Sequence, residues 1–173
     1  MKKLLFGICL TLLACGQNSH SQQHNKKNTI PDKYLGIYEY VDPYNKQDSS
    51  DNQYIVLTKT NDEITGLYYG TTDEFDEERE GYLAGFFVSP MDKLQINGDT
   101  IRFILNTSNS DFLTKPIDLK IKTTKEAIGK GYKNWDNKIP TTPKTYLGLI
   151  QDSVTIFFKR EKEYLNKTFK KKK

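Results

Sequence analysis

Short stretches in which apolar and polar residues alternate constrain the fold of this chain most. The clearest one runs from Ile117 to Lys122, where the apolar residues alternate with Asp118 and Lys120. Successive side chains of a β-strand point to opposite faces, so this period of two predicts a strand with one solvated face.

Asn97-Gly98 is the strongest turn signal of the chain. Both residues accept the positive φ of a type I′ turn, so strands are expected at 93–96 and 100–105. Further strands are expected at 34–40, 53–58, 64–70, 82–88, 117–121, 146–150 and 154–158. About eight or nine short strands joined to their sequence neighbours describe an antiparallel meander. We therefore expect a mostly β fold that closes fully or partly into a barrel, with a two-sheet sandwich as the alternative.

Two helices are expected beside the strands. Thr123 to Glu126 fits a capping box, and Gly131 would end a short helix near 124–131. A C-terminal helix is expected from Glu161 to Phe169, because four of its residues would lie along one stripe: Tyr164, Leu165, Thr168 and Phe169.

The motif Gly36-Ile37-Tyr38 resembles the Gly-x-aromatic start of lipocalins, with Tyr38 standing where lipocalins usually have tryptophan. The resemblance is one of overall shape and covers most of the folded region. It implies a meander barrel with a C-terminal helix packed outside it.

The chain begins with Lys2 and Lys3, followed by an apolar run from Leu4 to Ala14. This run is too short to span a bilayer and is typical of a secretory signal peptide, here residues 1–14. The residues Leu12-Leu13-Ala14-Cys15 resemble the lipobox of bacterial lipoproteins. That resemblance implies that Cys15 becomes the first mature residue and carries the lipid.

Gly16 and Gln17 follow the cysteine, and neither is the aspartate that retains many lipoproteins at the inner membrane. The resemblance therefore implies a lipid anchor at the periplasmic face of the outer membrane. Residues 15–29 are polar and lack aromatic side chains, so we expect a flexible tether. About 14 flexible residues give a root-mean-square reach of roughly 20 Å. Residues 30–169 are expected to form one barrel-like domain, and 170–173 a basic tail.

Charge and cysteine content exclude several classes of function. Without Lys2, Lys3 and the four terminal lysines, the formal net charge falls from +4 to about −2, so nucleic acid is not expected as a partner. The only cysteines are Cys9 and Cys15, and no histidine or cysteine lies between Ile30 and Lys173. Ser-His-Asp and Cys-His catalysis and zinc held by these residues are thereby excluded from the domain, and no catalysis is expected.

An acidic stretch, Asp73 to Glu80, holds six carboxylates and Arg79. Like charges at this density need water, a cation or a basic partner to screen them. The interpretations left open are a solvated loop, a protein-contact surface, and a carboxylate-dependent hydrolase as the enzymatic alternative. A further one is a calcium site, because calcium prefers several oxygen ligands, here Asp73, Glu74, Asp76 and Glu77.

Aromatic residues are abundant, and Tyr68, Phe86 and Trp135 are the candidates for lining a ligand cavity. A barrel of about eight strands is either filled by side chains or holds one small ligand. The expected function is a membrane-anchored binding or interaction module without a cofactor. Its partners would be the lipid bilayer through Cys15 and either a small apolar ligand or an envelope protein.

Overall fold

The computed structural model describes residues 32–41, 52–61, 63–72, 75–76, 81–82, 85–135, 143–158 and 167–173. For 75–76 and 81–82 it describes the backbone only. The expected signal peptide, Cys15 and the tether lie outside the described residues. None of the helices in the described ranges is long and apolar enough to cross a bilayer.

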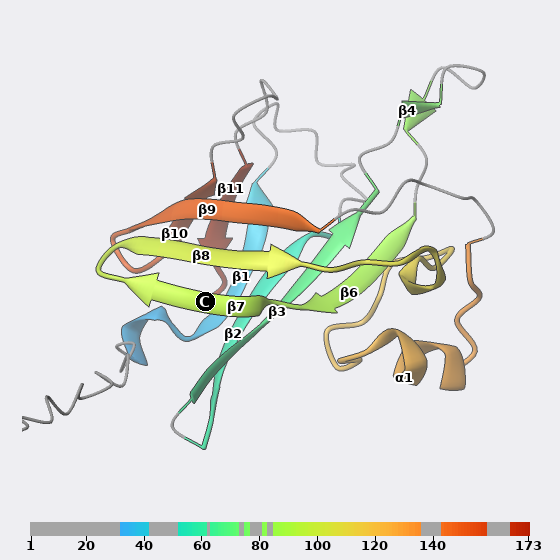
Figure 1. The fold of residues 1–173 in the computed structure, drawn as a ribbon, viewed down its shortest axis with the longest axis horizontal. Helices are drawn as coiled ribbons and strands as arrows, with labels where there is room; N and C mark the ends of the chain where they lie inside the picture. The colour runs from blue at the N-terminus through green and yellow to red at the C-terminus, as the bar shows by residue number, and fades with distance from the viewer. Residues whose placement is uncertain are drawn as a thin grey trace, which may run out of the picture.

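The described residues form a mostly β structure in which nine antiparallel strands make one nearly closed, barrel-like sheet, as expected (Figure 1). Its order is β6-β3-β2-β1-β11-β10-β9-β8-β7. The strands are β1 Gly36–Val41, β2 Tyr54–Thr60, β3 Glu63–Thr71, β6 Phe86–Pro90, β7 Asp92–Asn97, β8 Thr100–Leu105, β9 Lys144–Gln151, β10 Thr155–Phe158 and β11 Lys167–Lys171. Two short strands, β4 Phe75–Asp76 and β5 Gly81–Tyr82, pair with each other in a separate ribbon.

The strands follow one another around the barrel in chain order, and the first strand pairs with the last. Tyr40 of β1 lies opposite Phe169 of β11. The sheet order ends at β6 and β7, which only Met91 separates along the chain. Because β6 pairs with β3 and β7 pairs with β8, this one bent segment links the two ends of the sheet. At the bend, the Met91 N–H donates to the carbonyl of Gly66 at 2.9 Å.

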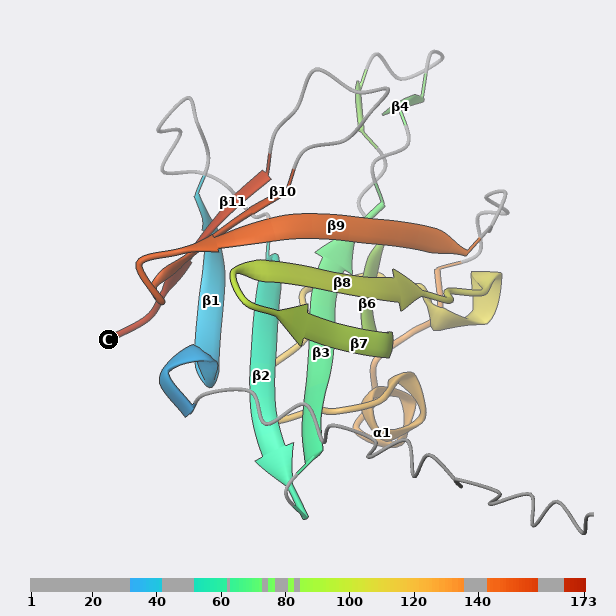
Figure 2. The ribbon, with the colours of Figure 1, turned by 60° about the vertical axis from the view of Figure 1, so that its left-hand side comes forward.

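The two ends of the barrel differ. Short turns at Gly98-Asp99 and at 152–154 join strands at one end, where a 3-10 helix, η1 (Asp32–Tyr34), also lies. We call this the turn end. The long connection between β8 and β9 leaves from the opposite end and contains α1 (Thr124–Gly129). In Figure 2, β7, β8 and β9 run across β1, β2 and β3, so the barrel has two layers of crossing strands.

One outer face of the barrel is covered by residues 112–132, the covering segment. Four side chains of the sheet, Val56, Tyr69, Phe86 and Val88, form the covered face. They pack against four buried residues of the covering segment: Leu113, Ile117, Ile121 and Ala127. Apolar burial of this kind contributes about 25 cal/mol per Å² removed from water, so this contact forms a second core outside the barrel.

The strand expected at 117–121 is wrong. The segment is a turn, in which the Ile121 N–H donates to the carbonyl of Asp118 at 2.9 Å. Ile117 and Ile121 are buried while Asp118 and Lys120 are exposed, so the alternation that predicted a strand is real. It arises because the segment lies on the covered face, and not because it pairs in a sheet.

The C-terminal helix is also wrong. Lys167 to Lys171 form β11, which pairs with β1 on one side and β10 on the other. Lys170 and Lys171, expected in a basic tail, therefore belong to the barrel. The rest of the expected helix, 161–166, lies outside the described residues.

Two smaller expectations need correction as well. The strand expected at 82–88 is divided, because β5 ends at Tyr82 and β6 begins at Phe86. The hairpin between β7 and β8 exists, but Asn97 pairs with Thr100, so the loop is Gly98-Asp99, one residue later than expected. Gly98 has a φ of 58°, which is the left-handed region that glycine accepts without strain.

The helix predicted near 124–131 is confirmed as α1. Its N-cap is Thr123, whose hydroxyl oxygen accepts from the Glu126 N–H at 3.1 Å. The Glu126 carboxylate accepts in turn from the Lys122 N–H at 2.9 Å. These bonds satisfy amide donors that have no partner inside a helix, which explains why so short a helix forms here.

Candidate functional site

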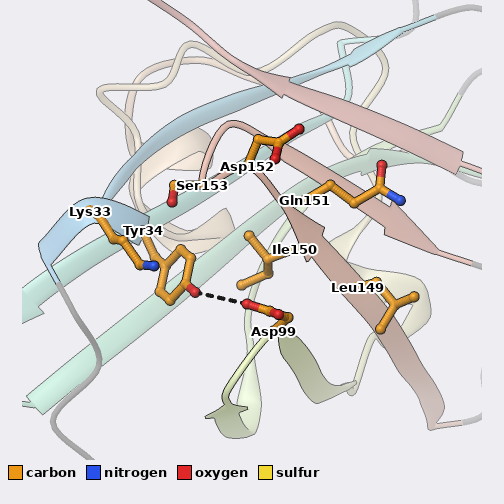
Figure 3. A pocket seen from close by; sticks show the side chains of 8 residues that line it. All are labelled: Lys33, Tyr34, Asp99, Leu149, Ile150, Gln151, Asp152 and Ser153. Carbon is orange, nitrogen blue, oxygen red and sulfur yellow. Dashed lines mark hydrogen bonds between the residues drawn. The ribbon is translucent and has the colours of Figure 1, made fainter.

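A shallow pocket opens at the turn end of the barrel, where three parts of the chain meet (Figure 3). Its lining comes from η1, from the β7–β8 turn and from the end of β9 with the turn after it: Lys33, Tyr34, Asp99, Leu149, Ile150, Gln151, Asp152 and Ser153. The Tyr34 hydroxyl donates to the Asp99 carboxylate at 3.2 Å. The Ile150 N–H donates to the Asp99 carbonyl at 2.7 Å, so Asp99 ties η1 to β9.

Tyr38 closes the barrel beneath this pocket and is fully buried. Its hydroxyl donates to the Tyr34 carbonyl at 2.8 Å and lies 3.3 Å from the Ser153 carbonyl. Burial, and next the neighbouring Tyr34, raise the pKa of Tyr38 to about 12. The phenol therefore stays protonated at physiological pH and acts as a hydrogen-bond donor.

Lys171 fixes η1 against the barrel from the other side. Its ammonium group donates to the Lys33 carbonyl at 2.9 Å and lies 5.8 Å from the centre of the Tyr38 ring. Gly36 has a φ of 141°, and a Cβ atom there would lie 2.6 Å from Cε of Lys171. Only glycine suits this position, so the Gly-x-aromatic motif has a local structural reason.

Aromatic side chains fill the interior of the barrel. Tyr68 is 1% exposed, and its ring centre lies 5.5 Å from that of Tyr146 and 6.0 Å from those of Phe87 and Phe169. Phe103 stacks on Tyr146 at 5.0 Å. These separations are those of directly packed aromatic rings, so the centre of the barrel is a side-chain core.

The end of the interior opposite the turn end is packed as well. The Phe112 ring lies 5.6 Å from Phe87 and 6.1 Å from Trp135, edge to face in both cases. The backbone N–H of Trp135 donates to the carbonyl of Phe112 at 2.9 Å. A Cβ atom at Gly85 would lie 2.7 Å from the indole ring, so glycine there lets Trp135 lie close to the sheet.

The structure does not bring the three predicted ligand-binding residues together. Tyr68 belongs to the interior core, whereas Phe86 belongs to the core under the covering segment. Trp135 is half-buried and packs against the interior core at its end. Local sequence patterns do not assign such aromatic positions to the inside or the outside of the sheet.

Of the predicted calcium ligands, Asp73, Glu74 and Glu77 lie outside the described residues, and Asp76 is described by its backbone alone. Asp76 belongs to β4 and lies opposite Gly81 of β5, so part of the acidic stretch belongs to a β-ribbon. In the described part of the chain, no three acidic, histidine or cysteine side chains gather as metal ligands would.

Tyr69 joins the covered face to the covering segment. Its hydroxyl donates to the Ile121 carbonyl at 2.8 Å, and the Leu119 carbonyl lies 3.2 Å away. Burial, and next the charges of Glu126 and Asp118, raise the pKa of Tyr69 to about 12. A protonated phenol at this position satisfies a turn that makes no sheet hydrogen bonds.

Sequence reasoning missed the apolar side chains on the outside of β9. Leu147 and Leu149 are 57% and 50% exposed. The residues that alternate with them along β9, Tyr146, Gly148 and Ile150, are buried and face inward. The signal was present as an unbroken apolar run from Tyr146 to Ile150. Apolar and polar residues should alternate along a barrel strand whose outer side faces water. An unbroken apolar run therefore indicates an outer surface that is apolar.

The described residues thus define a mostly β protein with a nearly closed, lipocalin-like barrel and a packed aromatic interior. Comparison with known proteins found no matching family model, no matching curated protein and no matching solved structure.

Proposed function

We propose that this chain is a lipid-anchored protein of the bacterial envelope, held at the periplasmic face of the outer membrane by acylated Cys15. Its barrel would be a non-enzymatic module that binds an envelope protein through its surface. The anchor is supported by the lipobox-like residues 12–15. Several acyl chains on one residue hold a protein on a bilayer far more stably than one chain does.

The observation that carries the choice of a surface partner over a small apolar ligand is the packed interior. Tyr68 contacts Phe87, Phe103, Tyr146 and Phe169 at ring-centre distances of 5.5 to 6.3 Å. Because a carrier of the lipocalin type needs a hollow interior, these contacts favour recognition by the outer surface.

The geometry also favours the acidic stretch as the surface that meets the partner. β3 ends and β6 begins at the end of the barrel opposite η1, and β4 lies beyond that end in Figure 1. The tether would join the barrel at η1. β4, which contains Asp76 of the acidic stretch, would therefore lie away from the anchor, where acidic side chains would suit a basic surface of another protein.

Detergent-phase partitioning tests the anchor. The native protein is expected in the detergent phase, and Cys15→Ser in the aqueous phase. Tryptophan fluorescence of the native protein during titration with fatty acids tests the choice of ligand, because Trp135 is the only tryptophan. A flat response is expected, and a saturable change would favour the carrier function instead.

Cross-linking in intact cells tests the protein partner. The native protein is expected to give a discrete adduct that is lost when the stretch is neutralised by Asp73→Asn, Glu74→Gln, Asp76→Asn and Glu77→Gln. The matched control neutralises four carboxylates that are exposed elsewhere: Asp32→Asn, Glu63→Gln, Asp118→Asn and Asp152→Asn. An adduct that survives the first set, or disappears in both, would contradict a specific role of the acidic stretch.

A further inference from the structure

The outer surface of β8, β9 and β10 carries exposed apolar side chains that none of the described residues covers. Leu149 lies between Thr100 of β8 and Phe157 of β10, and Leu147 lies opposite Arg102. We call this surface, with the neighbouring Ile104, the β9 face. Four large apolar side chains in the described ranges are strongly exposed, and three of them belong to β9 or the turn after it: Leu147, Leu149 and Val154. Grouped exposure of this kind marks an interaction surface.

The β9 face carries one cation and has acids at its edges. Arg102 is exposed and lies opposite Leu147. Lys144 lies opposite buried Leu105, so its position has the inward-facing parity of β9. The neighbouring acids are Asp92, opposite Ile104, Asp99, which accepts a hydrogen bond from Tyr34, and Asp152 in the turn. Exposed leucines beside an arginine suit the headgroup region of a lipid surface.

The position of η1 adds a second, independent argument. Lys33 and Tyr34 of η1 line the same pocket as Leu149 and come from the side of the chain that leads back to Cys15 (Figure 3). A polar tether of about 14 residues has a reach of roughly 20 Å, comparable with the size of the barrel itself. An anchor on Cys15 would thus hold the β9 face at high effective concentration beside the bilayer.

We propose that the β9 face is a membrane-docking surface, with Leu147 and Leu149 among the lipid headgroups and Arg102 against a lipid phosphate. This inference rests on the proposed lipid anchor and adds an orientation to it. With this face on the bilayer, the covered face points away from the membrane.

The test uses the full acylated protein in vesicles of phosphatidylethanolamine and phosphatidylglycerol. Cys9 leaves with the signal and Cys15 is acylated, so Leu149→Cys introduces a single reactive thiol for an environment-sensitive fluorophore. Thr65→Cys is the matched control, because Thr65 is exposed on β3, at the other side of the barrel. A lipid-borne nitroxide is expected to quench the label at 149 several-fold more strongly than the label at 65.

A charge variant extends the same measurement. Arg102→Gln is expected to weaken the quenching at 149 at least two-fold. Lys120→Gln, which removes an exposed cation from the opposite side, should leave it unchanged. Equal loss in the two variants would overturn the role assigned to Arg102.

Flotation of the vesicles tests the lipid anchor separately from the orientation of the barrel on the membrane. Labelled protein that floats with the vesicles but is quenched equally at both positions would overturn the orientation alone. Protein that fails to float would overturn the anchor, and the orientation with it. A label at 149 that is shielded from aqueous iodide without quenching by the lipid nitroxide would assign the β9 face to a protein partner and overturn membrane docking.

Discussion

The covered face and the β9 face lie on the same barrel, yet the chain treats them differently. The covered face packs Val56 and Tyr69 beneath buried Leu113 of the covering segment. On the β9 face, Leu147 is 57% exposed and Leu149 is 50% exposed. Both outer surfaces are apolar, so the difference teaches that an apolar outer strand is not by itself evidence of a core. What distinguishes the faces is whether the described part of the chain supplies a cover.

The largest expected difference between the faces is in stability. Leu113→Ala should lower the free energy of unfolding by about 3 kcal/mol, because Leu113 is fully buried and its loss leaves a cavity. Leu149→Ala should change it by less than about 0.5 kcal/mol, because Leu149 is half exposed. Urea unfolding followed by circular dichroism measures both. Equal losses would mean that the β9 face is part of the folding core.

Counted for a single side chain, the pH dependence of stability gives the next largest effect. Burial raises the pKa of Tyr69 and of Tyr38 to about 12. An unfolded tyrosine loses its proton near pH 10, so the folded state holds these protons more tightly. Their contribution is fully present below about pH 10 and is lost as the pH rises towards 12, on the order of 2 kcal/mol for each phenol.

Unfolding in urea at a series of pH values from 9 to about 12 measures this loss. The control is Tyr69→Phe, which should lose less stability over the same interval because one of the two phenols is absent. Identical pH profiles for the two proteins would contradict the burial of a protonated Tyr69 under the covering segment.

Tyr69→Phe also tests the cover at neutral pH. The variant leaves the Ile121 carbonyl without its 2.8 Å hydrogen bond and should cost about 1–2 kcal/mol. Tyr132→Phe is the control, since the Tyr132 hydroxyl makes only a 3.4 Å contact with the exposed Asp118 N–H. A control that costs as much as Tyr69→Phe would show that the effect does not come from the bond to Ile121.

The smallest effect is expected at the N-cap of α1. Thr123→Ala removes the acceptor of the Glu126 N–H and should cost about 1 kcal/mol. Thr123→Ser keeps the hydroxyl and should recover most of that stability. If both variants behave alike, the cap does not hold the covering segment in place.

The sequence predicted the barrel because most of its strands and hairpins can be recognised from residues that are close together in the chain. The β7–β8 and β9–β10 hairpins rest on turn residues and on short apolar runs, and both are present. The pairing of β11 with β1 joins residues more than 120 positions apart, which no local pattern reveals. Phe169 fits a helical stripe and a strand equally well, and only its partner Tyr40 decides between them.

The candidate sites were harder to predict for the same reason. An alternating run predicts that one side of a segment is buried, and Ile117 and Ile121 are indeed buried. It does not say whether the segment pairs in a sheet or lies across one. Likewise, the content of aromatic residues left a filled barrel and a ligand cavity both open, and the side of the sheet on which Tyr68 and Phe86 lie depends on the register of β3 with β6.

Oxidative footprinting of the unmodified, acylated protein tests the central contrast most directly. Leu149 on the β9 face and Ile128 on the covering segment have similar exposed fractions, 50% and 45%, in the folded protein. In vesicles containing anionic lipid, hydroxyl radicals should modify Leu149 several-fold more slowly than Ile128. Similar rates for the two residues would contradict the proposal that the β9 face lies on the membrane.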